Sequence, residues 1–368
     1  LYQLIFSAFL LFSNAYLVKA NSDILSQDST GKYCINTEQD YYNFIENIQN
    51  YNNKTVILCN DIDISDVPEA TSSFGGILNG KGHTITYASK EAKENIAVFP
   101  FRINDNGIVE NINVQIDESY AYNSETDEFQ TVFSQCDGIA KGITIKGNVT
   151  CIYDDEDEDV SIGAIEGNGT LMDSSIAITY DLQSEKTIEE IAEDIVENDL
   201  EFEFCQLGTA YAGITYQNCI GYGQYSEAIK SLADELEPKI EDNTWGNLCV
   251  SFTRKSFYST SASATNCYYD KENMPDIKIR SEYIANRDNN KEFPNYADFG
   301  KTTSEMKNQG TYEGFDFNKK WTISPEDNNG YPYYNLQTEE ITLKVQASTE
   351  PKVWSTSVPR DYNRFVDY

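Results

Sequence analysis

The 368-residue sequence is poor in the residue types that most often carry catalysis. It contains one histidine, His83, and six arginines. Any Ser-His-Asp or Cys-His nucleophile system would have to use that single imidazole. No Gly-x-Ser-x-Gly motif accompanies it, so nothing supports a hydrolase of that type. The sequence therefore predicts no catalytic residues.

Long hydrophobic runs are also scarce. Residues 1–12 form one apolar run, which is short for a membrane span and is followed by the small residues Val18 and Ala20 at signal-cleavage spacing. We expect residues 1–20 to be a signal peptide, with the mature chain beginning at Asn21. No later stretch is long and apolar enough to cross a bilayer, so we expect no membrane span in the mature chain. These features predict a protein that is secreted and extracellular or held at the cell surface.

The cysteines lack a Cys-x-x-Cys pair, which argues against structural zinc and thioredoxin-like redox chemistry. In an oxidising compartment, their even number predicts disulfides. The eight candidates are Cys34, Cys59, Cys136, Cys151, Cys205, Cys219, Cys249 and Cys267. Their order favours four local pairs, 34 with 59, 136 with 151, 205 with 219 and 249 with 267, although other connectivities stay open.

The net charge of −33 excludes some classes of partner. Such an acidic surface repels nucleic acid and anionic membranes. A disordered acidic chain would have few aromatic residues, whereas this one has 26 Tyr, 18 Phe and 3 Trp. The sequons at Asn53, Asn148 and Asn168 are candidate glycosylation sites. We therefore expect an acidic, folded glycoprotein whose partner is an extracellular glycan or protein surface, with self-association as a further option.

Two acidic patterns are candidate sites. Residues 154–159 are six consecutive carboxylates, of which Asp154, Asp155, Asp157 and Asp159 are weak calcium candidates. The run lacks EF-hand spacing, so a solvated loop is favoured, and no other metal site or cofactor is predicted. Asp61 and Asp63 share one face of an expected strand, where edge protection is favoured over glycoside hydrolysis.

Short β-branched segments separated by Gly and Asn recur from residue 74 onward, at intervals typical of solenoid coils. Residues 37–48 have the apolar stripe of a helix, and residues 187–200 and 226–240 show helical spacing that interrupts the repeat. The sequence thus predicts an all-β, right-handed parallel β-helix (solenoid) with an N-terminal helical cap and two amphipathic helical inserts. A β-sandwich is the alternative. The expected divisions are a cap at 21–73, the β-helix at 74–337, and a strand at 341–347 within a loosely ordered tail at 338–368.

Three local motifs strengthen this prediction. They are residues 60–64 (Asn-Asp-Ile-Asp-Ile), residues 80–85 (Gly-Lys-Gly-His-Thr-Ile), and a C-terminal block that runs from residues 267–270 to residues 330–333 (Gly-Tyr-Pro-Tyr). The pattern resembles GLUG-repeat and filamentous-haemagglutinin-like right-handed β-helix surface proteins of the pectin-lyase-like fold, over roughly residues 34–337. The resemblance implies an extracellular adhesin or surface-layer component, and it implies a structural turn around His83.

The leading hypothesis is a non-enzymatic secreted or cell-surface protein that acts in adhesion or as a structural component of an extracellular coat or fibre. The alternative is a carbohydrate-active enzyme, a polysaccharide lyase or glycoside hydrolase, on the same fold. Lyases on β-helices use a basic residue beside calcium-binding acids, and Arg254-Lys255, the one basic pair within the expected coils, has no such acids nearby in sequence. A filament subunit is a third option. Tyrosines near the expected corners (Tyr216, Tyr222, Tyr225, Tyr258, Tyr268 and Tyr269) could stack on sugars, but core packing is favoured for most of them.

Overall fold

A computed structural model provides the structure of the chain. The residues that it describes are 25–65, 67–68, 70, 72–88, 97–121, 130–153, 160–198, 200–208, 213–239, 247–251, 263–274, 277–280, 299–335, 340–346 and 351–357. The predicted signal peptide, the acidic run at 154–159, Arg254-Lys255 and Tyr258 lie outside this set.

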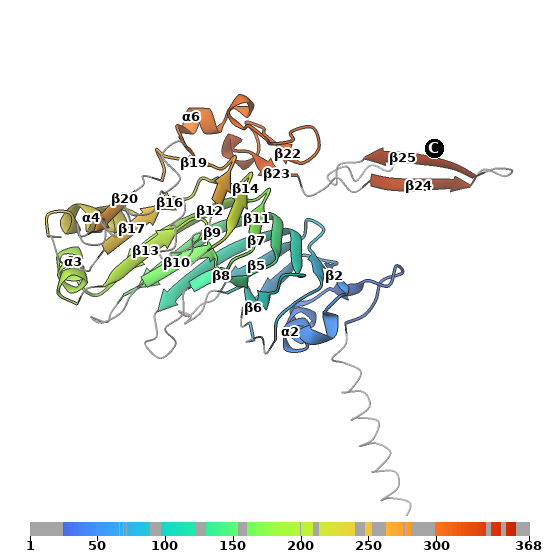
Figure 1. Cartoon of the computed structure of the whole chain (residues 1–368), viewed down its shortest axis with the longest axis horizontal. Coiled ribbons are helices and arrows are strands. Elements are labelled where there is room, and N and C mark those ends of the chain that lie inside the picture. The colour runs from blue at the N-terminus through green and yellow to red at the C-terminus, as the bar shows by residue number, and fades with distance from the viewer. Residues whose placement is uncertain are drawn as a thin grey trace, which may run out of the picture.

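Two mostly parallel sheets dominate the described part of the chain (Figure 1). The larger sheet contains β1 (Tyr33–Ile35), β2 (Thr55–Leu58), β3 (Ile62–Ile64), β4 (Ile77–Asn79), β5 (Thr84–Ala88), β7 (Ile108–Ala121), β9 (Ile139–Ile152), β11 (Thr170–Met172), β12 (Ser175–Gln183), β14 (Thr215–Gln217), β15 (Ile220–Gly221), β16 (Gln224–Tyr225), β18 (Ser263–Thr265), β19 (Tyr268–Asp270) and β21 (Gly300–Lys301). The smaller sheet contains β6 (Phe99–Ile103), β8 (Gln130–Cys136), β10 (Val160–Ile165), β13 (Glu201–Cys205), β17 (Asn247–Ser251) and β20 (Ile277–Arg280).

The long strands β7, β9 and β12 form the centre of the larger sheet, where they pair in parallel over most of their length. Their side chains alternate between the core and the opposite face. Ile145 and Val149 of β9 are buried in the core, whereas Asn148 between them is exposed. This period of two explains why the β-branched segments form strands here.

Asn, Asp and Gly residues with positive φ mark one corner of successive layers. Asn111 (φ 56°), Gly142 (61°), Asp173 (50°), Asn218 (52°) and Asn266 (53°) occupy equivalent positions in the pairing of β7, β9, β11, β14 and β18. Left-handed backbone angles are accessible to Gly and tolerated by Asn and Asp. The Asn and Gly residues that separate the strand segments in the sequence thus form tight bends at these corners.

Three helices lie where the apolar spacing predicts them. They are α2 (Glu38–Glu46), α3 (Ile188–Glu197) and α4 (Glu227–Leu236), and each begins after a Thr or Ser whose side chain accepts a backbone N–H bond in the first turn. Their apolar faces are part of the main core: Phe44, Ile195 and Leu232 are all fully buried there. Figure 1 shows α3 and α4 together at one end of the sheets and α2 near the other.

The prediction of an all-β right-handed β-helix is wrong. Among the described residues, the strands form two separate sheets rather than one closed solenoid, and the larger runs from an edge at β1 to an edge at β21. The smaller sheet ends with the antiparallel pair β17–β20. Because α2, α3 and α4 are built into the same core as the strands, the described chain fits an α/β fold better. The repeated β-branched segments specify parallel pairing of the strands, but they do not specify that the sheets close into a solenoid.

Residues 299–335, called the C-terminal segment below, pack on the outer face of the larger sheet, which is the face turned away from the main core. They contain β21, α6 (Thr303–Met306), the short 3₁₀ turns η3 (Gln309–Thr311) and η4 (Asn328–Gly330), and the antiparallel pair of β22 (Trp321–Thr322) and β23 (Tyr333–Tyr334). Trp321 is 1% exposed in a second core cluster, which also contains Ile220 and Tyr268 from the sheet. The aromatic C-terminal motif is therefore a packing motif.

Two further elements complete the description. The 3₁₀ turn η1 (Ile48–Tyr51) follows α2. Beyond the C-terminal segment, β24 (Glu340–Gln346) pairs antiparallel with β25 (Pro351–Ser357). The strand expected at 341–347 is confirmed within one residue, but residues 351–357 of the predicted loose tail form a strand as well.

Candidate binding surface

The outer face of the larger sheet contains rows of short polar side chains in register. In one row, Asp63 of β3 lies beside Thr86 of β5, which lies beside Gln115 of β7 and then Lys146 of β9. Neighbouring strands are about 4.8 Å apart, so these side chains stand next to one another. Asp63 and Gln115 are exposed, and Thr86 and Lys146 are half-buried.

A second row lies two residues further along the same strands. Asp117 of β7 pairs with Asn148 of β9, Asn148 with Thr179 of β12, and Thr179 with Gln224 of β16. All are exposed except Thr179, which is half-buried. We call the two rows together the polar face. Its members are Asp63, Thr86, Gln115, Asp117, Lys146, Asn148, Thr179 and Gln224.

The C-terminal segment borders the polar face. Lys146 Nζ donates a hydrogen bond of 2.5 Å to Asn328 Oδ1, and Tyr222 stacks on Tyr331 with ring centroids 4.5 Å apart. Thr144 and Ser175, which precede the polar rows on β9 and β12, are 6% and 0% exposed. The segment thus covers one part of the outer face and leaves the polar rows beside it exposed or half-buried.

The charge of the polar face is mainly negative. Asp63 and Asp117 are carboxylates, and Lys146 is the one cation among the eight members. Burial lowers the pKa of the Lys146 ammonium group, because removal from water disfavours its charged form. The surface is therefore matched to neutral or basic groups, and it opposes acidic ligands.

His83 lies at the edge of this surface and acts in a turn. Its Nδ1 lies 3.0 Å from Asp61 Oδ1, and the same oxygen accepts the backbone N–H of Thr84 at 2.9 Å. Asp61 thereby holds the residues that lead into β5. Asp63 lies two residues further on the same outer face. The predicted structural role of this segment agrees with these contacts.

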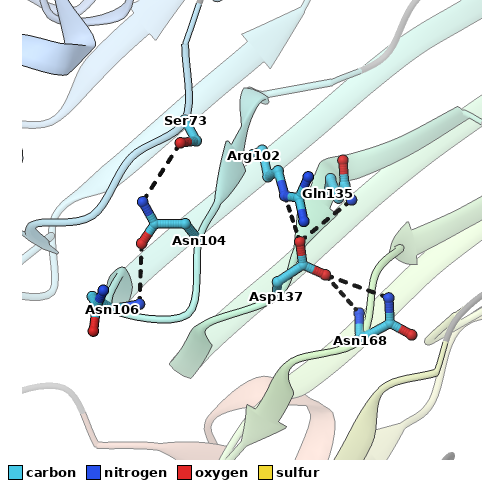
Figure 2. A network of polar contacts seen from close by, with 7 residues as sticks. All are labelled: Ser73, Arg102, Asn104, Asn106, Gln135, Asp137 and Asn168. Atoms are coloured by element: carbon cyan, nitrogen blue, oxygen red, sulfur yellow. Dashed lines mark hydrogen bonds and ion pairs between the residues drawn. The ribbon is translucent and has the colours of Figure 1, made fainter.

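A second polar network joins three layers at the corner that leads from the smaller sheet to the larger one (Figure 2). Arg102 Nε donates to Asp137 Oδ2 at 2.6 Å, and Gln135 Nε2 donates to the same oxygen at 3.3 Å. Oδ1 of Asp137 accepts the backbone N–H of Asn168 at 3.2 Å. The Asp137 side chain is only 7% exposed, and both oxygens of its carboxylate accept hydrogen bonds within the protein. The network therefore has a structural role: it connects the chain at the end of β6, after β8 and before β11.

In Figure 2, Asn104 lies beside this network, in the turn that follows β6. Its Oδ1 accepts the backbone N–H of Asn106 at 3.0 Å, and its Nδ2 lies 3.5 Å from Ser73 Oγ. Asn104 and Asp137 thus satisfy backbone donors in adjacent corners, as short polar side chains do in turns.

The structure contains one of the four disulfides that the local scheme predicts. Cys34 and Cys59 form a disulfide, which confirms the first predicted pair. The other described cysteines are buried thiols outside any disulfide: Cys136, Cys151, Cys205, Cys219 and Cys267. The predicted pairs 136–151 and 205–219 are not formed. In each of them one cysteine lies on a strand of the smaller sheet and the other on the larger sheet. The side chain of Cys249 lies outside the described residues.

The three sequon asparagines, Asn53, Asn148 and Asn168, are all exposed, as acceptor sites must be. Asn148 is also a member of the polar face, so a glycan there would stand among its rows. The calcium candidates Asp154, Asp155, Asp157 and Asp159 lie outside the described residues. Within the described ranges, no three His, Cys, Asp or Glu side chains are grouped to hold a metal ion.

The tyrosines considered for sugar stacking are packing residues wherever the structure describes them. Tyr216, Tyr225 and Tyr269 are at most 5% exposed in the main core, and Tyr268 is 8% exposed in the second cluster. Burial raises the pKa of Tyr222 to about 12. The favoured interpretation of core packing holds for these residues.

Sequence reasoning missed the polar face. The signal was present, because Gln115, Asp117, Lys146 and Asn148 alternate with apolar residues in two long strands. What was missing was the register, since only the pairing of β7 with β9 places these four side chains in two aligned rows.

In comparisons with protein-family models, with curated proteins and with solved structures, nothing matches this chain. Among the helices that the structure describes, none is long and apolar enough to cross a membrane.

Proposed function

We propose that this chain is a secreted or cell-surface, non-enzymatic protein that acts in adhesion or in an extracellular coat or fibre, and that the polar face binds a neutral, hydroxyl-rich glycan. One observation carries the proposal: two registered rows of amide, hydroxyl and carboxylate side chains, with one lysine among them, on the outer face of the sheet. Amides and carboxylates bond readily to sugar hydroxyls, and the strand spacing of about 4.8 Å is on the scale of one sugar ring.

Two further features support an extracellular location. The Cys34–Cys59 disulfide is typical of oxidising compartments. The exposed sequon asparagines are accessible to the glycosylation machinery of a secretory pathway. Because the polar face is mainly acidic, neutral polysaccharides are better ligands than acidic ones.

The test is binding of the full chain, purified from a secretory host, to immobilised β-glucan, chitin, mannan and polygalacturonate. We expect binding to at least one neutral polymer and none to polygalacturonate. Substituting Gln115→Lys or Thr179→Lys should weaken that binding about tenfold or more, because each places a long cation in a polar row. Gln217→Lys changes an equally exposed glutamine of β14 outside the polar face, and it should leave binding unchanged.

Asn148 is both a member of the polar face and a candidate glycosylation site, and enzymatic removal of N-glycans distinguishes these two roles. If a glycan at Asn148 shields the polar face, deglycosylation and Asn148→Gln should both strengthen binding. Reducing-end release is followed in the same samples. Reproducible cleavage of any polymer would contradict the non-enzymatic function, and equal loss of binding in the Gln115 and Gln217 variants would contradict the assigned surface.

A further inference from the structure

Cys219 and Cys267 occupy equivalent positions in two neighbouring parallel strands. Gln217 pairs with Thr265 on one side of them, and Ile220 pairs with Tyr268 on the other. The backbone N–H of Tyr268 donates to the carbonyl of Cys219 at 2.9 Å. Neighbouring strands are about 4.8 Å apart, which lies inside the range of about 4.4–6.8 Å between Cα atoms that disulfides bridge.

Both side chains point into the same core. Cys219 and Cys267 are each fully buried in the main cluster, whereas the next residues, Ile220 and Tyr268, belong to the cluster under the C-terminal segment. The corner residues before them are also aligned, because Asn266 Nδ2 donates to Asn218 Oδ1 at 3.3 Å. The alignment on both sides leaves the two sulfur atoms facing each other.

The surroundings agree with direct contact between the thiols. Burial raises the pKa of the Cys219 thiol, and a hydrogen bond with Cys267 raises it further. Their other hydrogen bonds are weak, because a thiol is a weak donor. Cys219 Sγ lies 3.4 Å from the Leu171 carbonyl and 3.5 Å from the Gln217 carbonyl, and Cys267 Sγ lies 3.5 Å from the Thr265 carbonyl.

We propose that Cys219 and Cys267 form an interstrand disulfide when the chain folds in an oxidising compartment. Each thiol loses a proton, an Sγ–Sγ bond forms, and the two electrons reduce a small-molecule disulfide or the disulfide of an oxidoreductase to two thiols. Because both sulfur atoms are buried in the finished fold, the exchange takes place before the strands around them close. The bond would connect adjacent layers directly beneath the C-terminal segment, and it is independent of glycan binding.

This pairing differs from the local scheme that the spacing of the cysteines favours. Cys205, the local partner expected for Cys219, lies at the end of β13 in the smaller sheet. Digestion with trypsin distinguishes a bond from Cys219 to Cys267 from the local pair of Cys249 with Cys267. Cys267 lies in peptide 256–271 and Cys249 in peptide 240–254, whereas Cys205 and Cys219 lie together in peptide 187–230.

The experiment refolds the full chain in a buffer of reduced and oxidised glutathione, blocks free thiols with N-ethylmaleimide, and maps the unreduced tryptic peptides by mass spectrometry. We expect peptides 187–230 and 256–271 to be linked, and fragmentation to place the bond at Cys219. The link should persist in Cys205→Ser and disappear in Cys219→Ser.

The wild-type map decides the question even if a variant fails to fold, and the Cys34–Cys59 link in the same digest reports correct oxidation. A map in which that link is present while Cys267 is alkylated would overturn the proposal. So would a link from peptide 256–271 to peptide 240–254, or a bond placed at Cys205.

Discussion

Removing one hydroxyl group from Tyr331 should loosen the C-terminal segment. Tyr331 is 6% exposed, and its hydroxyl donates at 2.5 Å to Oδ2 of Asp270, a carboxylate that is fully buried. The hydroxyl also accepts a bond from Asn273 Nδ2 at 3.0 Å. A hydrogen bond to a buried charged group contributes about 1.5–3 kcal/mol. Tyr331→Phe leaves Thr303 and Asn273 as side-chain donors to Asp270, so we expect a loss within that range.

Hydrogen exchange measured by mass spectrometry is the appropriate assay, because it reports opening of residues 299–335 separately from global unfolding. A loss of about 1.5–3 kcal/mol corresponds to exchange that is about 10- to 150-fold faster in peptides from that segment. Tyr42→Phe is the matched control, since the Tyr42 hydroxyl donates at 2.6 Å to the exposed carboxylate of Glu38. A surface change of this kind should alter stability by about 0.5 kcal/mol or less.

Two outcomes would refute this reasoning. Exchange in residues 299–335 could stay within about threefold of wild type in Tyr331→Phe, which would mean that the buried hydrogen bond contributes little. Alternatively, Tyr331→Phe and Tyr42→Phe could accelerate exchange equally around their own sites, which would mean that burial of the carboxylate is not the deciding factor.

Three other predictions concern stability. Replacing both Cys34 and Cys59 with Ser removes a disulfide of sequence separation 25 and should lower the free energy of unfolding by about 3 kcal/mol. Urea unfolding measures this loss, and an unchanged midpoint would mean that the disulfide does not stabilise the fold. Gly147 has φ 134°, and in Gly147→Ala the new Cβ would clash with a backbone oxygen of β7, so this change should unfold the centre of the sheet. Gly31→Ala is the control: it has free space around it and should cost only about 1 kcal/mol. Both variants are compared with wild type in circular-dichroism melts. Burial raises the pKa of Tyr222 to about 12, so the folded state retains a proton that the unfolded chain loses near pH 10. The contribution of Tyr222 to stability should therefore be constant below about pH 10 and be lost as the pH rises towards 12. Tyr222→Phe should reduce the fall of the urea midpoint between about pH 10 and about pH 12, and an unchanged fall would contradict this assignment.

The local elements of this protein could be predicted from the sequence because they depend on short-range patterns. The apolar stripes of α2, α3 and α4, the capping residues before them and the Asn and Gly corners all follow from period and backbone preference. The buried C-terminal motif was also visible as an aromatic cluster, although its place on the outer face of the sheet was not.

Closure of the sheets and the arrangement of the core cysteines could not be predicted in the same way, although the Cys34–Cys59 disulfide was predicted. A repeated β-branched segment stabilises parallel pairing in a solenoid and in a separate sheet alike, so the order of the strands and the packing of the helices into the core are needed to distinguish them. Spacing along the chain likewise suggested bonds between neighbours in sequence. Residues such as Cys219 and Cys267 meet because their strands are neighbours in space.

The sequence by itself determined where helices, strands and tight corners form, since these depend on residues a few positions apart. Only the tertiary structure decided which polar residues share a surface. Gln115 and Lys146 belong to one row because β7 and β9 pair in a particular register, and a shift of one residue would turn one of them into the core. Register depends on the packing of the whole sheet against its helices, which no local stretch of sequence contains.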